Sequence, residues 1–264
     1  MPGQWKSLQI VVFVIGILMV SVAQAASDRE KLLSETGVYG TFAVFKMAED
    51  WWKLDKDLRS KSAAEVNTIF QKHAQWVVTD TVLVRGLSER ADFFIRVHST
   101  ELLSNQNFLL DLMGTTLGKH MINTDTFNGI TKKANYIPSF PEDLKAAMKT
   151  PTDPGVKPYA IVVPIRKDAL WWIMDDDDRN QMMKEHAEAT IKYLKTVKRK
   201  LYHSSGLDDF DFITYFETAK PEDFNNLIIA LLGVNENRHN NQFGTPTLIG
   251  TIRSLEEILE ILTR

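Results

Sequence analysis

Apolar and polar positions repeat a common pattern in the two halves of the chain. Residues 38–54 (VYGTFAVFKMAEDWWKL) and 158–174 (PYAIVVPIRKDALWWIM) each contain an apolar run with the character of a strand. A tyrosine opens each run, Tyr39 in the first half and Tyr159 in the second, and a Trp-Trp pair follows twelve residues later. The tryptophan pairs are offset by 120 residues. This pattern predicts an internal duplication.

Each repeat continues with the same order of elements. In the first half we expect a strand over 92–97 and a helix over 107–113, and in the second half a strand over 211–216 and a helix over 225–232. The order strand, helix, strand, strand, helix, with a last short strand, is the ferredoxin-like plan, in which helices cover one face of an antiparallel sheet. The sequence therefore predicts an α+β fold in which two ferredoxin-like domains pack sheet against sheet into a dimeric α+β barrel.

Proline and glycine mark the junction between the two halves. Residues 149–158 (KTPTDPGVKP) lack hydrophobic periodicity, as a linker should. We expect an N-terminal ferredoxin-like domain over 27–150 and a C-terminal one over 151–264. A second irregular segment, 129–140 (GITKKANYIPSF), carries aromatic and basic side chains that can reach a ligand, although a plain connecting loop is the default interpretation.

The first residues have the pattern of a secretory signal peptide. Lys6 precedes an apolar run over 10–20, and Ala-Gln-Ala follows at 23–25, where signal peptidase needs small side chains. An uncleaved membrane anchor is the alternative, but the run is shorter than the ~20 apolar residues that span a bilayer. We expect residues 1–26 to be removed, leaving a periplasmic protein with no stable membrane insertion.

Composition narrows the possible chemistry. The chain has 264 residues, of which 44% are hydrophobic and 25% are charged, as is typical of globular proteins. It has no cysteine, which excludes cysteine nucleophiles, iron–sulfur clusters and thiolate-ligated haem. The formal net charge of -3 argues against general nucleic-acid binding.

A change of periodicity between His186 and Arg199 suggests a site. An acidic run at 175–178 and helix-forming residues through Leu194 predict a helix that carries His186, and a strand is expected from Thr196 onward. On one continuous helix the two side chains would lie roughly 220° apart. On a helix followed by a strand, they can reach one cavity from opposite walls. An axial imidazole opposite a cation is how a haem protein binds and activates a small anion.

Residue types alone leave this hypothesis open. A lone histidine is more often structural than a metal ligand, and the chain has six histidines. No HExxH, GxGxxG or P-loop motif is present. His73 corresponds to His186 in the repeat, but the first half lacks a counterpart of Arg199, so we interpret His73 as structural or as a relic. Without further information, the sequence indicates an exported α+β protein.

The second half resembles a known family. The segments EHAEATIKYLKTVKRKLYHSSGLDDFDFITYFE, FNNLIIALLGVNENRH and FGTPTLIGTI are similar to those of the haem-containing chlorite dismutases, in particular their long-chain, exported, homopentameric branch. The resemblance implies haem b, one per subunit, in a homopentamer. It also implies conversion of chlorite to chloride and dioxygen, through an oxo-ferryl species and hypochlorite that recombine.

The same resemblance implies roles for three central residues. His186, within EHxxxT, matches the proximal haem ligand. Glu236, within VNEN, matches the carboxylate that accepts a hydrogen bond from the other imidazole nitrogen, which makes the histidine a stronger donor to iron. Arg199 matches the distal arginine, whose guanidinium stays charged and can hold an anion near iron. A surface carboxylate is the alternative for Glu236, and pairing with Asp208 or Asp209 is the alternative for Arg199.

Five further residues match positions around the haem. Lys167 and Trp171 correspond to residues near the haem edge, with the lysine neutralising a propionate, and Trp172 fits a packing role beside the haem. Tyr136 and Ile137 correspond to the loop that closes over the propionates.

Two alternative functions remain open. One is another haem enzyme of the superfamily, a peroxidase or a coproheme decarboxylase; the predicted signal peptide and Arg199 count against the decarboxylase. The other is a non-catalytic exported haem-binding protein, which the complete set of predicted site residues disfavours.

Overall fold

A computed structural model describes residues 29–135 and 137–264, so the predicted signal peptide and Tyr136 lie outside the described residues. The duplicated α+β plan is confirmed. The first half contains β1 (Tyr39–Met47), α2 (Lys56–His73), β2 (Val78–Leu83), β3 (Phe93–Ser99), α3 (Leu102–Gly114), β4 (Met121–Ile130) and α4 (Glu142–Met148). The second contains β5 (Tyr159–Lys167), α5 (Ala169–Ile173), α6 (Asp176–Thr190), β6 (Val197–His203), β7 (Phe212–Thr218), α7 (Pro221–Leu232), β8 (Asn240–Phe243), β9 (Leu248–Ile252) and α8 (Leu255–Thr263).

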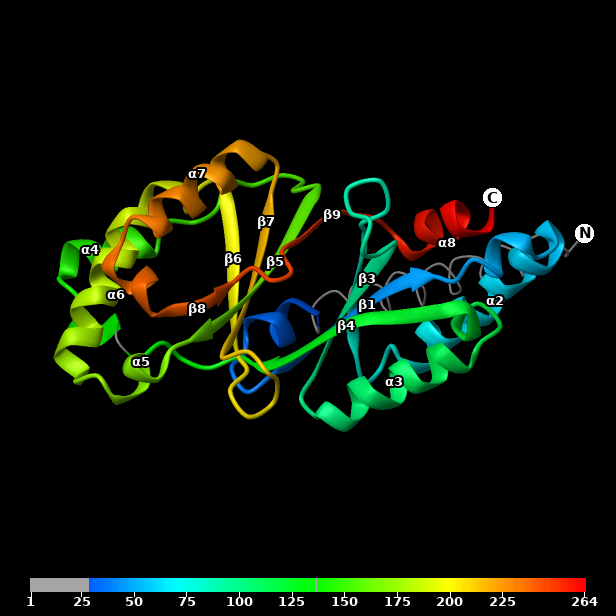
Figure 1. Cartoon of the computed structure of the whole chain (residues 1–264), viewed down its shortest axis with the longest axis horizontal. Coiled ribbons are helices and arrows are strands. Elements are labelled where there is room, and N and C mark those ends of the chain that lie inside the picture. The colour runs from blue at the N-terminus through cyan, green and yellow to red at the C-terminus, as the bar shows by residue number, and fades with distance from the viewer. Residues whose placement is uncertain (1–28, 136) are drawn as a thin grey trace, which may run out of the picture.

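The strands of both halves form one closed antiparallel ring. Its order is β5, β7, β6, β4, β1, β3, β2 and β9, and β9 returns to β5. Strand β8 extends the pairing along the last residues of β5. Helices α2, α3 and α8 lie on one side of this barrel and α4, α6 and α7 on the other (Figure 1). The last helix of each half therefore crosses to the other half: Ile258 and Leu262 of α8 pack into the core of the first half, and Leu144 of α4 packs against Ala187 of α6.

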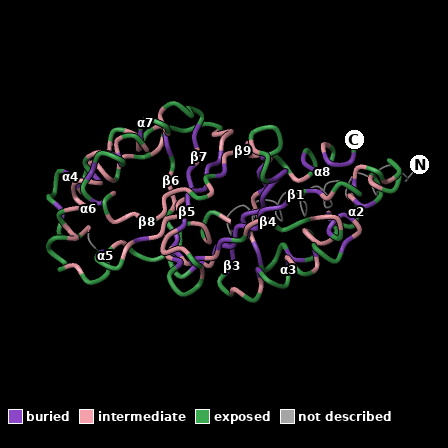
Figure 2. The backbone as a smooth tube through the Cα atoms, viewed as in Figure 1, coloured by how far each residue is buried: buried purple, intermediate pink, exposed green. Residues whose placement is uncertain are grey.

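Alternation along the strands separates the barrel interior from the two outer layers. On β1, Phe42 and Val44 join the core inside the barrel, whereas Ala43 and Phe45 pack toward the helices of the first half. On β5, Ala160 points inward in the same way. Successive strand side chains point to opposite faces, so each strand contributes to two cores. The buried residues accordingly concentrate on the strands, between the helical layers (Figure 2).

Several element boundaries differ from the predicted ones. The helix that carries His186 ends at Thr190 rather than Leu194, and a short 3-10 turn, Ile191–Tyr193, leads toward β6. Helix α7 begins four residues before the predicted start, because Pro221 occupies its first turn, where a missing N–H costs nothing. Strands β3 and β7 each begin one residue after the predicted start and end two residues after the predicted end.

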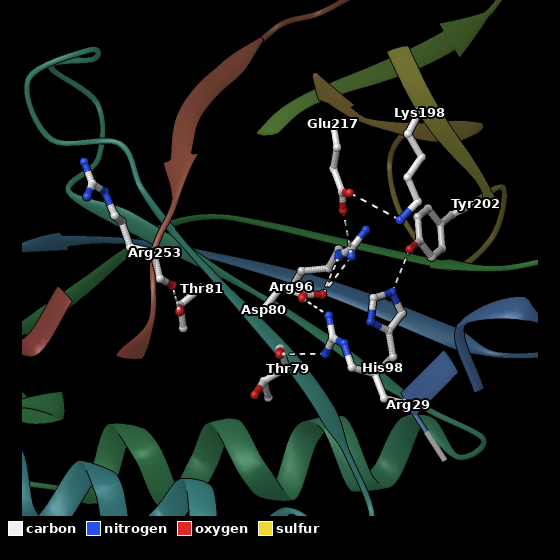
Figure 3. Close-up of polar contacts among 10 residues, drawn as sticks. All are labelled: Arg29, Thr79, Asp80, Thr81, Arg96, His98, Lys198, Tyr202, Glu217 and Arg253. Carbon is white, nitrogen blue, oxygen red and sulfur yellow. Dashed lines mark hydrogen bonds and ion pairs between the residues drawn. The ribbon is translucent and has the colours of Figure 1, made fainter. Parts of the chain in front are cut away.

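A buried ionic cluster joins the two halves inside the barrel (Figure 3). Arg96 of β3 lies 2.7 Å from the Asp80 carboxylate of β2 and 3.6 Å from Glu217 of β7, and its guanidinium lies 3.7 Å from the centre of the Tyr215 ring. The Arg96 side chain is only 4% exposed. Removing one partner from such a buried set leaves an uncompensated charge, so the cluster fixes how the halves meet.

No helix within residues 29–135 or 137–264 combines the length and apolarity needed to cross a membrane.

His98 makes the stability of the barrel dependent on pH. Burial lowers the pKa of His98 well below 6.5, and the Arg96 cation lowers this pKa further. The unfolded chain therefore binds a proton below about pH 6.5 that the folded chain does not, and stability is lost as the pH falls. Relative to a His98→Gln variant, the wild type should lose up to ~1.4 kcal/mol more unfolding free energy per pH unit. Urea unfolding at several pH values would measure this, and parallel pH profiles would contradict it.

Candidate functional site

A cavity of about 530 Å³ lies in the second half, between the outer face of the sheet and helices α6 and α7. Strand alternation builds its floor, because every second residue of β6 and β7 points to this side: Arg199, Leu201, His203, Phe212, Thr214 and Phe216. The volume is in the range of about 300–1,000 Å³ that is usual for small-molecule and cofactor sites.

His186 stands in the α6 wall of this cavity. Its Nδ1 lies 3.3 Å from Oε2 of Glu236, so Nε2 is the ring nitrogen left to bind a metal. Burial, together with the Arg199 and Lys167 cations, lowers the pKa of His186 to about 4. The ring is therefore neutral near neutral pH, which is the form that ligates metals.

Glu236 connects His186 to a second group of residues. It lies in a short 3-10 helix, Asn235–His239, and its side chain is 9% exposed. Its Oε1 forms an ion pair with Lys167, whose Nζ also donates to Asn240 Oδ1 over 2.7 Å and lies 4.3 Å from the centre of the Trp171 ring. Four of the predicted residues thus form one connected chain of contacts.

Arg199 reaches the same cavity from β6. Its Nη1 donates to Oγ1 of Thr190 over 3.0 Å and its Nη2 to the Thr190 carbonyl over 3.1 Å. Thr190 Oγ1 in turn donates to the carbonyl of His186, one turn earlier on α6. The structure therefore brings His186 and Arg199 together in one cavity. Sequence reasoning missed Thr190 as the contact that orients the arginine, although it is the last residue of the EHxxxT segment.

The remaining predicted residues are placed differently. Trp172 is 47% exposed, lines the cavity at its rim and stacks on Phe212, with ring centres 6.1 Å apart. Ile137 is half-buried and is not among the described residues that line the cavity. The loop before it contributes Lys132, Lys133 and Asn135 instead. The basic pair in segment 129–140 was the signal that could have singled them out.

The corresponding space in the first half is filled. Trp51 is fully buried there, and its indole Nε1 donates to the carbonyl of Leu262 in α8 over 2.8 Å. Phe108 packs in the same core, and the cavity left among the described residues measures about 10 Å³. His73 ends α2, and its Nε2 lies 2.8 Å from Oδ2 of Asp111. Among the described residues, the core of this half is therefore packed with side chains where the second half has its cavity, and His73 has a structural partner.

A duplicated ferredoxin-like barrel with a cofactor-sized cavity that is walled by a histidine–carboxylate pair defines a class of ligand-binding α+β proteins. The family model described as chlorite dismutase matches residues 59–253, and the chain belongs to this family. It is 40% identical over 238 residues to a chlorite dismutase of Ideonella dechloratans, which covers 89% of this chain and 84% of that protein.

Two further relatives are a solved structure and a more distant protein with a different name. The solved structure of a chlorite dismutase from Candidatus Nitrospira defluvii in complex with imidazole is 51% identical, covers 90% of this chain and 100% of its own, and superposes with a TM-score of 0.88. A coproheme decarboxylase of Mycolicibacterium smegmatis is 27% identical over 231 residues, which is 86% of this chain and 95% of that protein.

The ion pair of Lys167 and Glu236 can be tested by a double-mutant cycle. Lys167→Met leaves a buried carboxylate without its cation and should lower the unfolding free energy by about 3–5 kcal/mol. The double variant Lys167→Met, Glu236→Gln removes both charges and should recover a large part of this loss. Urea unfolding of the four proteins measures the coupling; additive losses would show that the two side chains do not interact.

Proposed function

We propose that this protein is a haem b enzyme that converts chlorite to chloride and dioxygen, with one haem per subunit in a homopentamer exported to the periplasm. The observation that carries the proposal is the cavity shared by a neutral His186, oriented by Glu236, and the Arg199 cation on the facing strand. Membership of the chlorite dismutase family supports the same activity.

The residues of the cavity fit a haem. His186 would supply the axial ligand through Nε2, and Glu236 would accept the Nδ1 hydrogen bond, a pairing that strengthens the imidazole as a donor. Apolar walls such as Phe243 and Leu227 suit a porphyrin, while Lys132, Lys133 and Arg179 line the same cavity and can meet carboxylates. A haem needs only one histidine from the protein as its axial ligand.

When bound, the haem iron would supply the redox chemistry that breaks the chlorine–oxygen bonds. The task left to the protein is to hold the anion, and Arg199 can do so because its guanidinium does not lose its proton. The conversion of chlorite to chloride and dioxygen balances without protons or external electrons, so no general base is required. In a cavity with mostly apolar walls, the attraction between Arg199 and the anion is stronger than in water.

His186→Ala should abolish stable haem binding, because the variant removes the imidazole that Glu236 orients toward the cavity. The Soret absorption of the purified protein reports this directly. His73→Ala is a matched control, since His73 lies in the filled half, and it should retain the Soret band. An unchanged Soret band in His186→Ala would contradict the proposed ligand.

Arg199→Ala should bind haem normally but lose chlorite turnover by about tenfold or more, which corresponds to about 1.4 kcal/mol of transition-state stabilisation. An oxygen electrode measures dioxygen release after chlorite is added. Arg199→Lys keeps the positive charge and should retain more activity than the alanine variant. Turnover equal to the wild type in Arg199→Ala would refute the anion-holding role. A haem-loaded wild type that releases no dioxygen would favour a decarboxylase, a peroxidase or a non-catalytic haem protein.

A further inference from the structure

A second cavity, of about 420 Å³, opens where the barrel wall is weakest. Strands β4 and β6 are joined by a single residue pair, Ile130 with His203. Before that pair, from Val197 to Tyr202, the described pairing of β6 is with β7 alone. The edge of β6 is therefore uncovered by a strand, and the second cavity lies along it.

The lining of this second cavity is strongly basic. Two carboxylates, Glu35 and Glu217, face five cationic side chains: Arg96, Lys132, Lys198, Arg199 and Lys200. The whole chain carries a formal net charge of -3, so the charge of this region is opposite in sign to that of the chain as a whole. Such a charge distribution attracts small anions and raises their local concentration.

The basic side chains extend from solvent toward the interior. The Lys198 side chain is 60% exposed, and its Nζ lies 3.3 Å from a Glu217 carboxylate oxygen. Lys200 is partly buried and donates a hydrogen bond from Nζ to the carbonyl of Leu33, so residues 33–36 cover one side of the cavity. Arg96, at the inner end, is almost fully buried.

The two cavities share a wall. The residues that line both are Lys132, Asn135, Arg199, Lys200, Leu201 and His203. Arg199, which we assign to the anion in the first cavity, therefore also lines the second. An anion that enters the basic cavity meets Arg199 without crossing the apolar walls of the first cavity.

We propose that this second cavity is the vestibule through which the anionic substrate reaches Arg199 and the product anion leaves, with Lys198 and Lys200 as its attracting charges. This inference rests on the proposed function, because it assumes an anionic ligand at a haem in the first cavity. The lysines should speed the association of the anion with the site but not the chemical step. Their removal should therefore lower association rates and kcat/KM and leave kcat nearly unchanged.

The test uses two small ligands of haem iron that differ in charge. Azide is an anion at neutral pH, whereas hydrogen cyanide is uncharged. In the Lys198→Gln, Lys200→Gln double variant, the association rate of azide, followed by the Soret band in stopped flow, should fall by about threefold to tenfold and depend less on ionic strength. The rate for hydrogen cyanide should stay the same. For chlorite, kcat/KM should fall by a similar factor while kcat stays within about twofold.

Lys61→Gln is the matched control, since Lys61 is an exposed residue of α2 outside both cavities. It should leave azide association unchanged. An unchanged azide rate in the double variant would overturn the vestibule, as would equal losses for azide and hydrogen cyanide or an equal loss in Lys61→Gln. If the double variant fails to fold, Lys198→Gln alone, at a largely exposed position, should show a smaller loss for azide only.

The same measurements separate the two proposals. Wild-type protein that binds haem and shows lysine-dependent azide association, but releases no dioxygen from chlorite, would support the vestibule and refute the proposed activity. Dioxygen release from chlorite, together with azide association that does not depend on the lysines, would support the proposed activity and refute the vestibule. Wild-type protein that binds no haem would overturn both.

Discussion

The functional half of this protein depends on how the buried carboxylate of Glu236 is compensated. A carboxylate that is almost fully buried requires a cation or strong donors. Lys167 supplies the cation, and the other oxygen of Glu236 faces Nδ1 of His186. Because Lys167 balances the charge, the imidazole does not have to be protonated to satisfy the carboxylate. The low pKa of His186 agrees with a neutral imidazole. Glu236 orients this ring through Nδ1, so Nε2 is free to donate its lone pair to a metal.

The duplication shows how one fold yields a filled half and a hollow half. Both halves place a histidine on the long helix between their first and second strands, yet His73 contacts Asp111 and an aromatic core, whereas His186 lines a cavity. Helix α8 contributes to this difference, because Leu262 accepts the indole hydrogen bond of Trp51 and packs into the first core. Packing, and not the histidine itself, decides which half can hold a cofactor.

Local pattern was enough to predict the duplicated plan, the change from helix to strand between His186 and Arg199, and their access to one cavity. The contacts that position these residues were beyond its reach, because they join segments that only the folded ring brings together. The bond between Arg199 and Thr190 depends on where α6 ends, and the helix ends four residues before the predicted boundary. Lys132 lines the second cavity because β4 and β6 are paired only at Ile130 and His203. Hydrophobic periodicity does not predict where two strands stop pairing.

The strands form a closed ring, but the pairing between β4 and β6 is limited to one residue pair. Strands β1 and β4 are paired along most of their length, and so are β6 and β7, but the two sets meet through one residue pair between β4 and β6. The buried cluster around Arg96 ties β3 to β7 across the barrel and so fixes the halves on both sides of this short pairing. Lys198 and Lys200, on β6 beside this short pairing, line the second cavity together with Arg199. The interactions that close the barrel thereby also define the path by which an anion would reach the site.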